Sequence, residues 1–377
     1  MIYKDFKGLK LSALGLGTMR LPVIDGKNGQ IDEAATAKMV ALALEKGINY
    51  FDTAWMYHEY TSEEVIGKIL KQYPRDSFYL ATKFPGMNKE RRADPGAIFE
   101  KQLEKCQVDY FDFYLVHNLN EMSIDDYLDD DDKVMPYLLE QKEKGRIRHL
   151  GLSVHGSAET LKRFLDKWGE HMEFCQIQLN YIDWKLQLAR DKVALLNERN
   201  IPIWVMEPLR GGKLATLSEA NTAKLNALRP DEGVPAWGFR YLQTVPGVTM
   251  VLSGMSNEQQ LLDNIATFAT ERPLNEQEMN AIMEVAADMS GGVPCTSCRY
   301  CTTVCPSGLD IPELIGMYNE HVFSGGGFLA PMFVNAMHKD KRPSACIGCR
   351  ACERMCPQNI KISEVMADFI AMLEKKD

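Results

Sequence analysis

Short apolar segments alternate with helical segments over most of this chain, and this alternation limits the folds available to it. Apolar residues at intervals of three and four mark the helical segments, as in 34–46 and 62–71. Strand and helix repeated eight times over about 270 residues predict an α/β fold, a (β/α)8 TIM barrel, whose typical length is about 250 residues. The strands are expected at 14–17, 48–52, 78–83, 110–116, 149–153, 174–179, 202–206 and 248–253.

The second fold that fits this alternation is an open, doubly wound parallel sheet. The first strand runs into Gly15-Leu-Gly-Thr-Met-Arg20, which lacks the third glycine and the immediate helix of the dinucleotide-binding fingerprint. We therefore favour the barrel, with residues 1–13 forming a hairpin that covers one of its ends.

Charge and hydropathy exclude some classes of partner. No apolar run approaches the roughly 20 residues that a membrane span requires, and the first residues lack the apolar region of a signal peptide. The formal net charge of -9 disfavours nucleic acid and anionic membranes, because both attract basic surfaces. We expect a cytoplasmic protein with neither nucleic acid nor membrane as a partner.

The cysteines are distributed unevenly. Only Cys106 and Cys175 precede residue 290, and both are expected to be ordinary buried thiols. Eight more follow between Cys295 and Cys356. We therefore expect a barrel domain over 1–285 and a small, mainly helical domain over 286–377.

A linker is expected at 286–294, where the helical pattern gives way to Gly291, Gly292 and Pro294. Helices are expected beyond it at 311–321 and 363–375.

The motif C-x2-C-x2-C-x3-C-P occurs twice in this second domain. It is the ferredoxin pattern for 4Fe-4S clusters, in which the fourth cysteine of each motif binds the cluster of the other. Zinc is the main alternative, but zinc sites favour separated C-x2-C pairs, and disulfides are disfavoured in a reducing compartment. The expected ligands are Cys295, Cys298, Cys301 and Cys356 for one cluster, and Cys346, Cys349, Cys352 and Cys305 for the other.

Ionisable residues stand at the ends of three consecutive strands of the predicted barrel. Asp52 and Tyr57 follow the second strand, Lys83 ends the third and His117 ends the fourth. Taken singly, each has an ordinary explanation as a helix cap, a half-buried aromatic, a solvated charge or a satisfied histidine. Together they lie at the carboxyl edge of the strands, which is the catalytic face of such barrels.

These four residues suit proton transfer to a reduced carbonyl. An ammonium beside a phenol favours the phenolate, so Lys83 should lower the pKa of Tyr57 from its usual value near 10. Asp52 can hold the lysine ionised, and His117 can hydrogen-bond a substrate oxygen. Such a group can protonate the alkoxide that forms when hydride reduces a carbonyl.

The chain resembles the aldo/keto reductase superfamily over residues 1 to 285. The motifs that carry the resemblance are Gly15-Leu-Gly-Thr-Met-Arg20, Phe51-Asp-Thr-Ala54 with Tyr57, Ala81-Thr-Lys-Phe84, Leu115-Val-His117 and Gly145-Arg-Ile-Arg-His-Leu-Gly-Leu-Ser153. The resemblance implies a nicotinamide-dependent oxidoreductase acting on a carbonyl or alcohol. It assigns Tyr57 as general acid, Lys83 and Asp52 as the pair that tunes it, and His117 as the residue that orients the carbonyl.

The resemblance also implies the contacts of NADPH or NADH. Met206 and His155 stand where many relatives have an aromatic residue and an asparagine, and uncharged Gly254 and Gln260 stand where relatives place basic residues against the 2'-phosphate. The choice between the two coenzymes is left open. The implied contacts are Gly17, Thr18, Asp52, Ser153, His155, Gln176, Met206, Pro208, Leu209, Arg210, Gly211, Gly212, Lys213, Gly254, Gln260, Asp263 and Asn264.

The cysteine-rich domain is similar to the helical two-cluster domains of flavin-linked reductase complexes. Nicotinamide delivers two electrons together, whereas each cluster passes one, so the clusters either connect the barrel to a ferredoxin or flavoprotein partner or stabilise the fold. Two alternatives remain at this stage. One is a redox-sensing subunit that binds nicotinamide with little turnover, like the auxiliary subunits of potassium channels, and the other is an electron carrier whose barrel does no chemistry.

Overall fold

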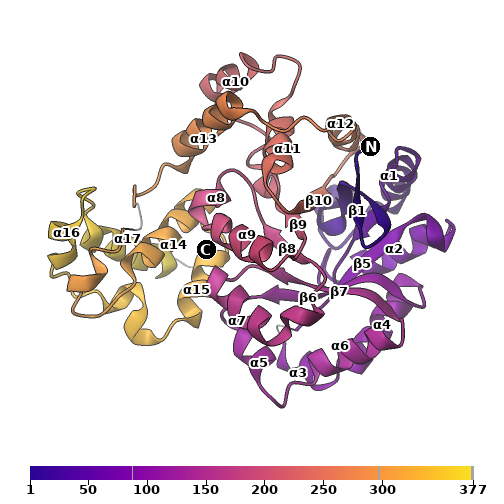
Figure 1. Cartoon of the computed structure of the whole chain (residues 1–377), viewed down its shortest axis with the longest axis horizontal. Coiled ribbons are helices and arrows are strands. Elements are labelled where there is room, and N and C mark those ends of the chain that lie inside the picture. Colours follow the sequence, from indigo (N-terminus) through magenta and orange to yellow (C-terminus); the bar gives the residue numbers. More distant parts are fainter. Residues whose placement is uncertain (87, 296–297, 375–377) are drawn as a thin grey trace. The chain divides into compact units, whose positions relative to one another are not determined.

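The computed structural model describes residues 1–86, 88–295 and 298–374. The chain divides into two compact units. The barrel unit comprises Met1–Trp184 and Leu188–Ile282, and the cysteine unit comprises Lys185–Gln187 and Met283–Asp377. Figure 1 shows the elements of both units.

Eight parallel strands of the barrel unit form a closed barrel in the order β10-β3-β4-β5-β6-β7-β8-β9, which confirms the predicted fold. Helices surround these strands in Figure 1. Burial of nearly every residue of β6 is typical of a parallel strand covered on both faces. The strands are β3 (Leu14–Gly17), β4 (Tyr50–Asp52), β5 (Tyr79–Phe84), β6 (Phe111–Leu119), β7 (Ile147–Val154), β8 (Cys175–Gln178), β9 (Ile203–Met206) and β10 (Val248–Gly254).

A hairpin of β1 (Tyr3–Phe6) and β2 (Leu9–Ser12) precedes the barrel, as expected. Phe6 and Leu11 are buried in a core cluster that includes Phe113 and Trp204 of the barrel strands. These strand residues lie toward the amino ends of β6 and β9. The hairpin therefore closes the amino end of the barrel.

Side-chain caps fix the starts of several helices. Asp32 accepts a hydrogen bond from the Ala35 N–H, Ser157 from that of Thr160, and Asn257 from that of Gln260. The helices up to the boundary are α1 (Glu33–Glu45), α2 (Ser62–Leu70), α3 (Lys89–Ala93), α4 (Pro95–Cys106), α5 (Ile124–Leu128), α6 (Val134–Glu143), α7 (Ala158–Trp168), α8 (Asp183–Leu186), α9 (Ala189–Glu198), α10 (Glu219–Asn226), α11 (Val234–Thr244), α12 (Glu258–Thr267) and α13 (Glu276–Ser290).

The expected linker at 286–294 is shorter than the sequence suggested, because α13 continues to Ser290. Ala281, Ile282, Val285 and Ala286 are buried and recur at helical spacing, so the apolar face of α13 extends past the expected boundary. The helix ends just before the glycine pair that the sequence analysis used to mark the linker.

The cysteine unit is mainly helical, with α14 (Ile311–Ser324), α15 (Leu329–Ala336), α16 (Ala351–Met355) and α17 (Ile362–Glu374). Helix α14 packs against both α15 and α17. The core of the unit includes Leu314, Met366 and Phe369, together with Cys301 and Cys352. Across the described ranges of the chain, no helix is both long enough and apolar enough to cross a membrane.

Candidate active site and cysteine pockets

Four predicted residues meet at the carboxyl edge of β4, β5 and β6. Lys83 Nζ lies 2.5 Å from Asp52 Oδ1, 2.8 Å from the Thr53 carbonyl oxygen and 3.3 Å from Tyr57 OH. These three contacts use all three donors of the ammonium. The His117 ring stands edge-on to the Tyr57 ring, with 6.3 Å between centroids. The site therefore combines a phenol, an ion pair and an imidazole.

The sequence analysis expected His117 to end its strand, and this expectation is wrong. Strand β6 continues to Leu119, and its pairing with β7 shifts register between Val116 and Leu119. Asn118, with φ of 56°, lies inside this irregularity. A bulge of this kind changes the direction in which neighbouring side chains point, and this one includes His117.

Burial determines the charge states of the phenol and the ion pair. Desolvation acts against the Lys83 ammonium, but Asp52 and Tyr57 outweigh it, so the pKa of Lys83 is raised. Desolvation also raises the pKa of Asp52, and Lys83 partly offsets that rise. The expected lowering of the Tyr57 pKa is wrong for this structure, because desolvation raises it by more than Lys83 lowers it.

Two histidines near the site are neutral at ordinary pH. Desolvation lowers the pKa of His117 well below its usual value, with Lys83 acting in the same direction. Desolvation, reinforced by Lys192, lowers the pKa of His155 to about 4. A neutral imidazole at His117 has one N–H to donate, as carbonyl binding requires.

Ser153 and Gln176, two of the residues implied for the nicotinamide, face each other across β7 and β8. Ser153 Oγ accepts a hydrogen bond from the Asn118 N–H at 2.9 Å. Gln176 Oε1 is buried, and the described part of the chain offers it no hydrogen-bond partner. Such an atom fits a ligand that brings a donor, since an unsatisfied buried acceptor is costly.

The loop after β9 combines unusual backbone geometry with charge. It begins with Met206 at the strand end and continues through Pro208 and Leu209. Gly211 and Gly212 both have positive φ, which favours glycine and exposes backbone N–H groups. The implied phosphate contact Arg210 is buried, with Nε 3.1 Å from the fully buried Asp183 carboxylate. Because a buried carboxylate requires a cation beside it, the Arg210 guanidinium mainly neutralises Asp183. Lys213 follows three residues later in the same loop.

Arg20 is a residue that the sequence analysis missed. Gly17 pairs with Gly254 across β3 and β10, and the Arg20 side chain lies against both Gly254 and Gly211. A Cβ added at Gly211 would be 2.7 Å from Arg20 Nη2. The sequence could have indicated Arg20 by its place in the motif Gly15-Leu-Gly-Thr-Met-Arg20 at the end of the first strand. Arg20 thus adds a half-exposed cation between Gly254 at the end of β10 and Gly211 in the loop after β9.

The remaining implied contacts are dispersed. Thr18 is buried, and its hydroxyl lies 2.8 Å from that of Ser62. Asn264 is buried and donates to Ser253 Oγ at 3.1 Å, beside the end of β10. Gln260 accepts from the backbone N–H of Ser256, and exposed Asp263 accepts from Gln259 on its own helix.

A buried polar network behind Lys83 was also missed. Gln102 Nε2 donates to the Lys83 carbonyl oxygen at 3.0 Å and to Glu63 Oε1 at 2.6 Å. Glu63 also accepts from Thr82 Oγ1 and Lys105 Nζ. Gln102 and Lys105 are polar residues among the buried residues of α4, and their place at helical spacing with Phe99 and Cys106 was the sequence signal for the network. The network fixes the backbone that carries Lys83.

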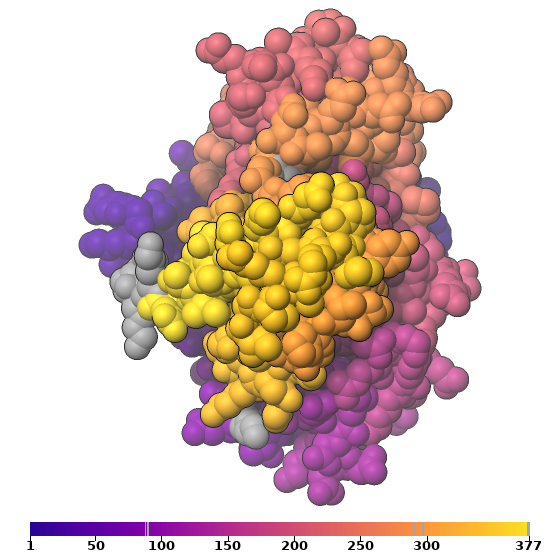
Figure 2. Space-filling model, turned by 90° about the vertical axis from the view of Figure 1, so that its left-hand side faces the viewer, coloured from indigo at the N-terminus to yellow at the C-terminus, as the bar shows by residue number. Residues whose placement is uncertain are grey.

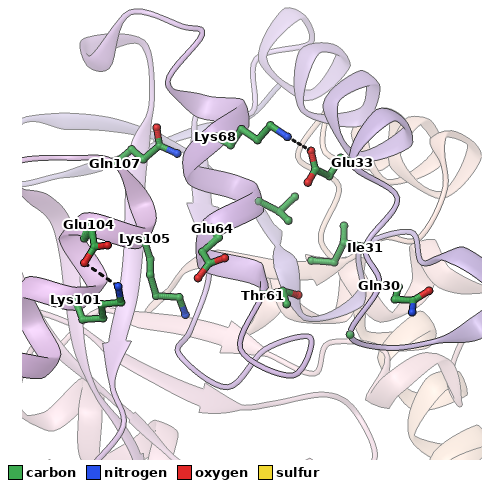
Figure 3. Close-up of a pocket in the computed structure, with 12 residues that line it drawn as sticks. Gln30, Ile31, Glu33, Thr61, Glu64, Lys68, Lys101, Glu104, Lys105 and Gln107 are labelled. Carbon is green, nitrogen blue, oxygen red and sulfur yellow. Dashed lines mark hydrogen bonds and ion pairs between the residues drawn. The ribbon is translucent and has the colours of Figure 1, made fainter.

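A surface pocket of about 460 Å³ lies beside α2 and α4 and contains none of the predicted catalytic residues (Figure 3). Its lining charges largely pair with one another, as Lys68 does with Glu33 and Lys101 with Glu104. The pocket is therefore no candidate for the reaction centre.

The eight clustered cysteines line two pockets of the cysteine unit. Within the described ranges, no three metal-ligating side chains converge on a position for one metal ion. Cys106 and Cys175 are buried elsewhere, as expected. One pocket is lined by Cys295, Cys298, Cys301 and Cys356, and the other by Cys305, Cys346, Cys349 and Cys352.

Comparison with known families covers both units. Residues 13–287 match the Aldo/keto reductase family, and residues 294–361 match the 4Fe-4S dicluster domain. An L-galactose dehydrogenase from Arabidopsis thaliana is 33% identical over 304 residues, spanning 74% of this chain and 91% of that protein. A probable aldo-keto reductase from Glycine max is 28% identical over 55% of this chain, and this chain spans only 58% of its length.

Solved structures of aldo-keto reductases also resemble the barrel unit. The holo form of an aldo-keto reductase from Bacillus halodurans has a TM-score of 0.61 and 25% sequence identity, covering 76% of this chain and 96% of that one.

Proposed function

Because this chain belongs to the aldo/keto reductase family and carries a 4Fe-4S dicluster domain, we propose that it transfers hydride between a nicotinamide coenzyme and the carbon of a small carbonyl or alcohol substrate. Tyr57 is the general acid in reduction and the general base in oxidation. The observation that carries the proposal is the pair of contacts from Lys83 Nζ to Asp52 and to Tyr57 OH at the barrel mouth.

Each residue of this site has a role in moving one proton. Burial raises the pKa of Tyr57, so the phenol keeps its proton until an alkoxide forms beside it. Lys83 stabilises the resulting phenolate, and Asp52 keeps Lys83 charged and aimed at the phenol. Neutral His117 donates a hydrogen bond to the substrate oxygen and holds the carbonyl toward Tyr57.

The residues implied for the coenzyme fit NADPH or NADH, which supplies or accepts the hydride when bound. Gln176 Oε1 would accept from the carboxamide N–H, and Ser153 would donate its O–H to the carboxamide oxygen. Arg20, Lys213 and the backbone of Gly211 would face the phosphates. His155 and Met206 would border the nicotinamide.

Two 4Fe-4S clusters would occupy the two cysteine pockets. One would be held by Cys356 with the first three cysteines of the first motif, and the other by Cys305 with the first three of the second motif. The location of these thiols around separate pockets supports this pairing. Each cluster exchanges single electrons, so we propose a ferredoxin or flavoprotein as the electron partner.

The proposal is tested with the complete, cluster-loaded protein. Tyr57→Phe should reduce coenzyme-dependent turnover by about 100-fold to 10,000-fold while leaving coenzyme affinity nearly unchanged, because it removes only the proton that is transferred. Tyr60→Phe, at an exposed tyrosine of the same loop, is the matched control and should keep its activity. Unchanged turnover in Tyr57→Phe would refute the catalytic assignment and favour a nicotinamide-binding sensor.

A further inference from the structure

Exposed apolar side chains adjoin the cysteines of both motifs. Tyr300 and Val304 each precede a cysteine, Ile347 follows one and Met355 precedes one, and all four are exposed. Ile347 is 69% exposed and also lines the second pocket. Single exposed apolar residues are common, but a group of them beside one kind of functional residue indicates a binding surface.

The second motif also lies in a stretch of net positive charge, whereas the chain as a whole is net negative. Residues 339–361 contain six lysines and arginines against two acidic residues, in a chain of net charge -9. Arg350 and Arg354 are exposed. Arg350 lines the same pocket as Ile347. Ile347 and Arg350 thus line one pocket, and the helix α16, which begins directly after Arg350, carries Arg354 and Met355.

The cluster position at this pocket lies close to the outside of the unit. Cys349 is exposed, whereas Cys352 is buried. Residues of this unit form much of the orange-to-yellow surface in Figure 2. An electron can therefore enter or leave at this surface without crossing the core of the unit.

We propose that Ile347, Arg350, Arg354 and Met355 form the docking face for a small acidic one-electron carrier protein. This inference rests on the proposed cluster at the second pocket and specifies its partner. Interfaces of electron-transfer proteins are small, and complementary charges steer their encounter. One electron passes between the reduced carrier and the oxidised cluster, no bond forms or breaks, and the carrier leaves oxidised by one electron.

The test uses the cluster-loaded full chain under anaerobic conditions. Reduced flavodoxin of net negative charge is mixed with the oxidised protein, and the second-order rate constant for cluster reduction is measured against ionic strength. A reduced cytochrome c-type protein with a basic surface is the mismatched probe for this face, and the binding of both probes to the parent and the charge-reversed protein is measured by calorimetry. We expect the flavodoxin rate to fall steeply with salt and to fall at least tenfold in Arg350→Glu/Arg354→Glu.

Ile347→Ser should lower the flavodoxin rate severalfold, whereas Phe328→Ser, an equally exposed apolar residue outside the motifs, should not. Cluster content by iron analysis and the electron paramagnetic resonance spectrum should match the parent protein in every variant. Equal rates in the charge-reversed and parent proteins, or equal binding of the acidic and basic probes, would overturn the docking face. Absence of iron from the parent protein would instead refute the proposed clusters.

Discussion

The barrel mouth and the cysteine pockets both hold reactive side chains in place, but they do so in different ways. At the barrel mouth, Lys83 and Asp52 are almost fully buried and bond directly to each other, and their positions follow from a closed sheet. In the cysteine unit, most of the pocket cysteines lie in loops and turns, Cys352 lies on the short helix α16, and Cys298 and Cys349 are exposed. We therefore expect the barrel site to be organised by the protein alone and the cysteine pockets to depend more on the clusters proposed for them.

The largest effect should come from breaking the ion pair at the barrel mouth. Lys83→Met leaves the Asp52 carboxylate buried without a cation, so we expect the barrel to lose about 3–5 kcal/mol of unfolding free energy and most of its turnover. Urea unfolding followed by tryptophan fluorescence reports this unit, because all five tryptophans precede residue 238.

The double variant Asp52→Asn/Lys83→Met is the control, since it removes both charges. It should recover most of the stability and none of the activity. If the double variant were no more stable than Lys83→Met, the loss would come from packing and the comparison would need revision.

Removal of iron should have a large effect on the cysteine unit alone. Each proposed cluster ties together motifs about forty residues apart, and metal binding contributes to folding when the site is incomplete without it. After anaerobic chelation, we expect amide hydrogen exchange to speed up at least tenfold in α14 and α17 and to stay unchanged in β4 to β6. Equal protection of α14 with and without iron would show that this unit, too, is organised by its protein core.

The sequence predicted the barrel well because its signals are local. Eight apolar segments, seven of which end within one residue of a strand end, were enough to place Asp52, Tyr57 and Lys83 at one edge. The cysteine spacing likewise predicted which thiols share a pocket. What the sequence could not supply were relations between distant segments, such as Gln102 against the Lys83 carbonyl, Arg210 against Asp183 and the irregular pairing at His117. The direction of the Tyr57 pKa also needed burial, which a motif does not contain.

The pH dependence of barrel stability should show a moderate effect. Unfolded His155 binds a proton near pH 6.5, while the folded residue does so only near pH 4, so the unfolded state binds more protons between about pH 6.5 and about pH 4. Barrel stability should therefore fall as the pH is lowered through this window, with His117 acting in the same direction. His155→Asn should reduce the slope, as measured by urea midpoints from tryptophan fluorescence. An unchanged slope would mean that His155 does not contribute.

The smallest effect should be at Arg20. Its half-exposed guanidinium contributes one charge near the proposed phosphate position, so Arg20→Gln should weaken coenzyme binding by about threefold to tenfold. Calorimetric titration with NADPH and NADH measures this loss, and Arg20→Lys should recover part of it. An unaltered dissociation constant for both coenzymes would place Arg20 outside the binding site.

The most direct measurement of the central claim is a single turnover with labelled coenzyme. Cluster-loaded protein is mixed anaerobically with NADPH or NADH carrying deuterium at the transferable position and with para-nitrobenzaldehyde as a general carbonyl probe. We predict that deuterium appears on the carbinol carbon of the product, and that Tyr57→Phe abolishes this transfer while Tyr60→Phe does not. Oxidation of the coenzyme with electrons reaching the clusters and no deuterium in the product would contradict hydride transfer to a carbonyl as the function of the barrel.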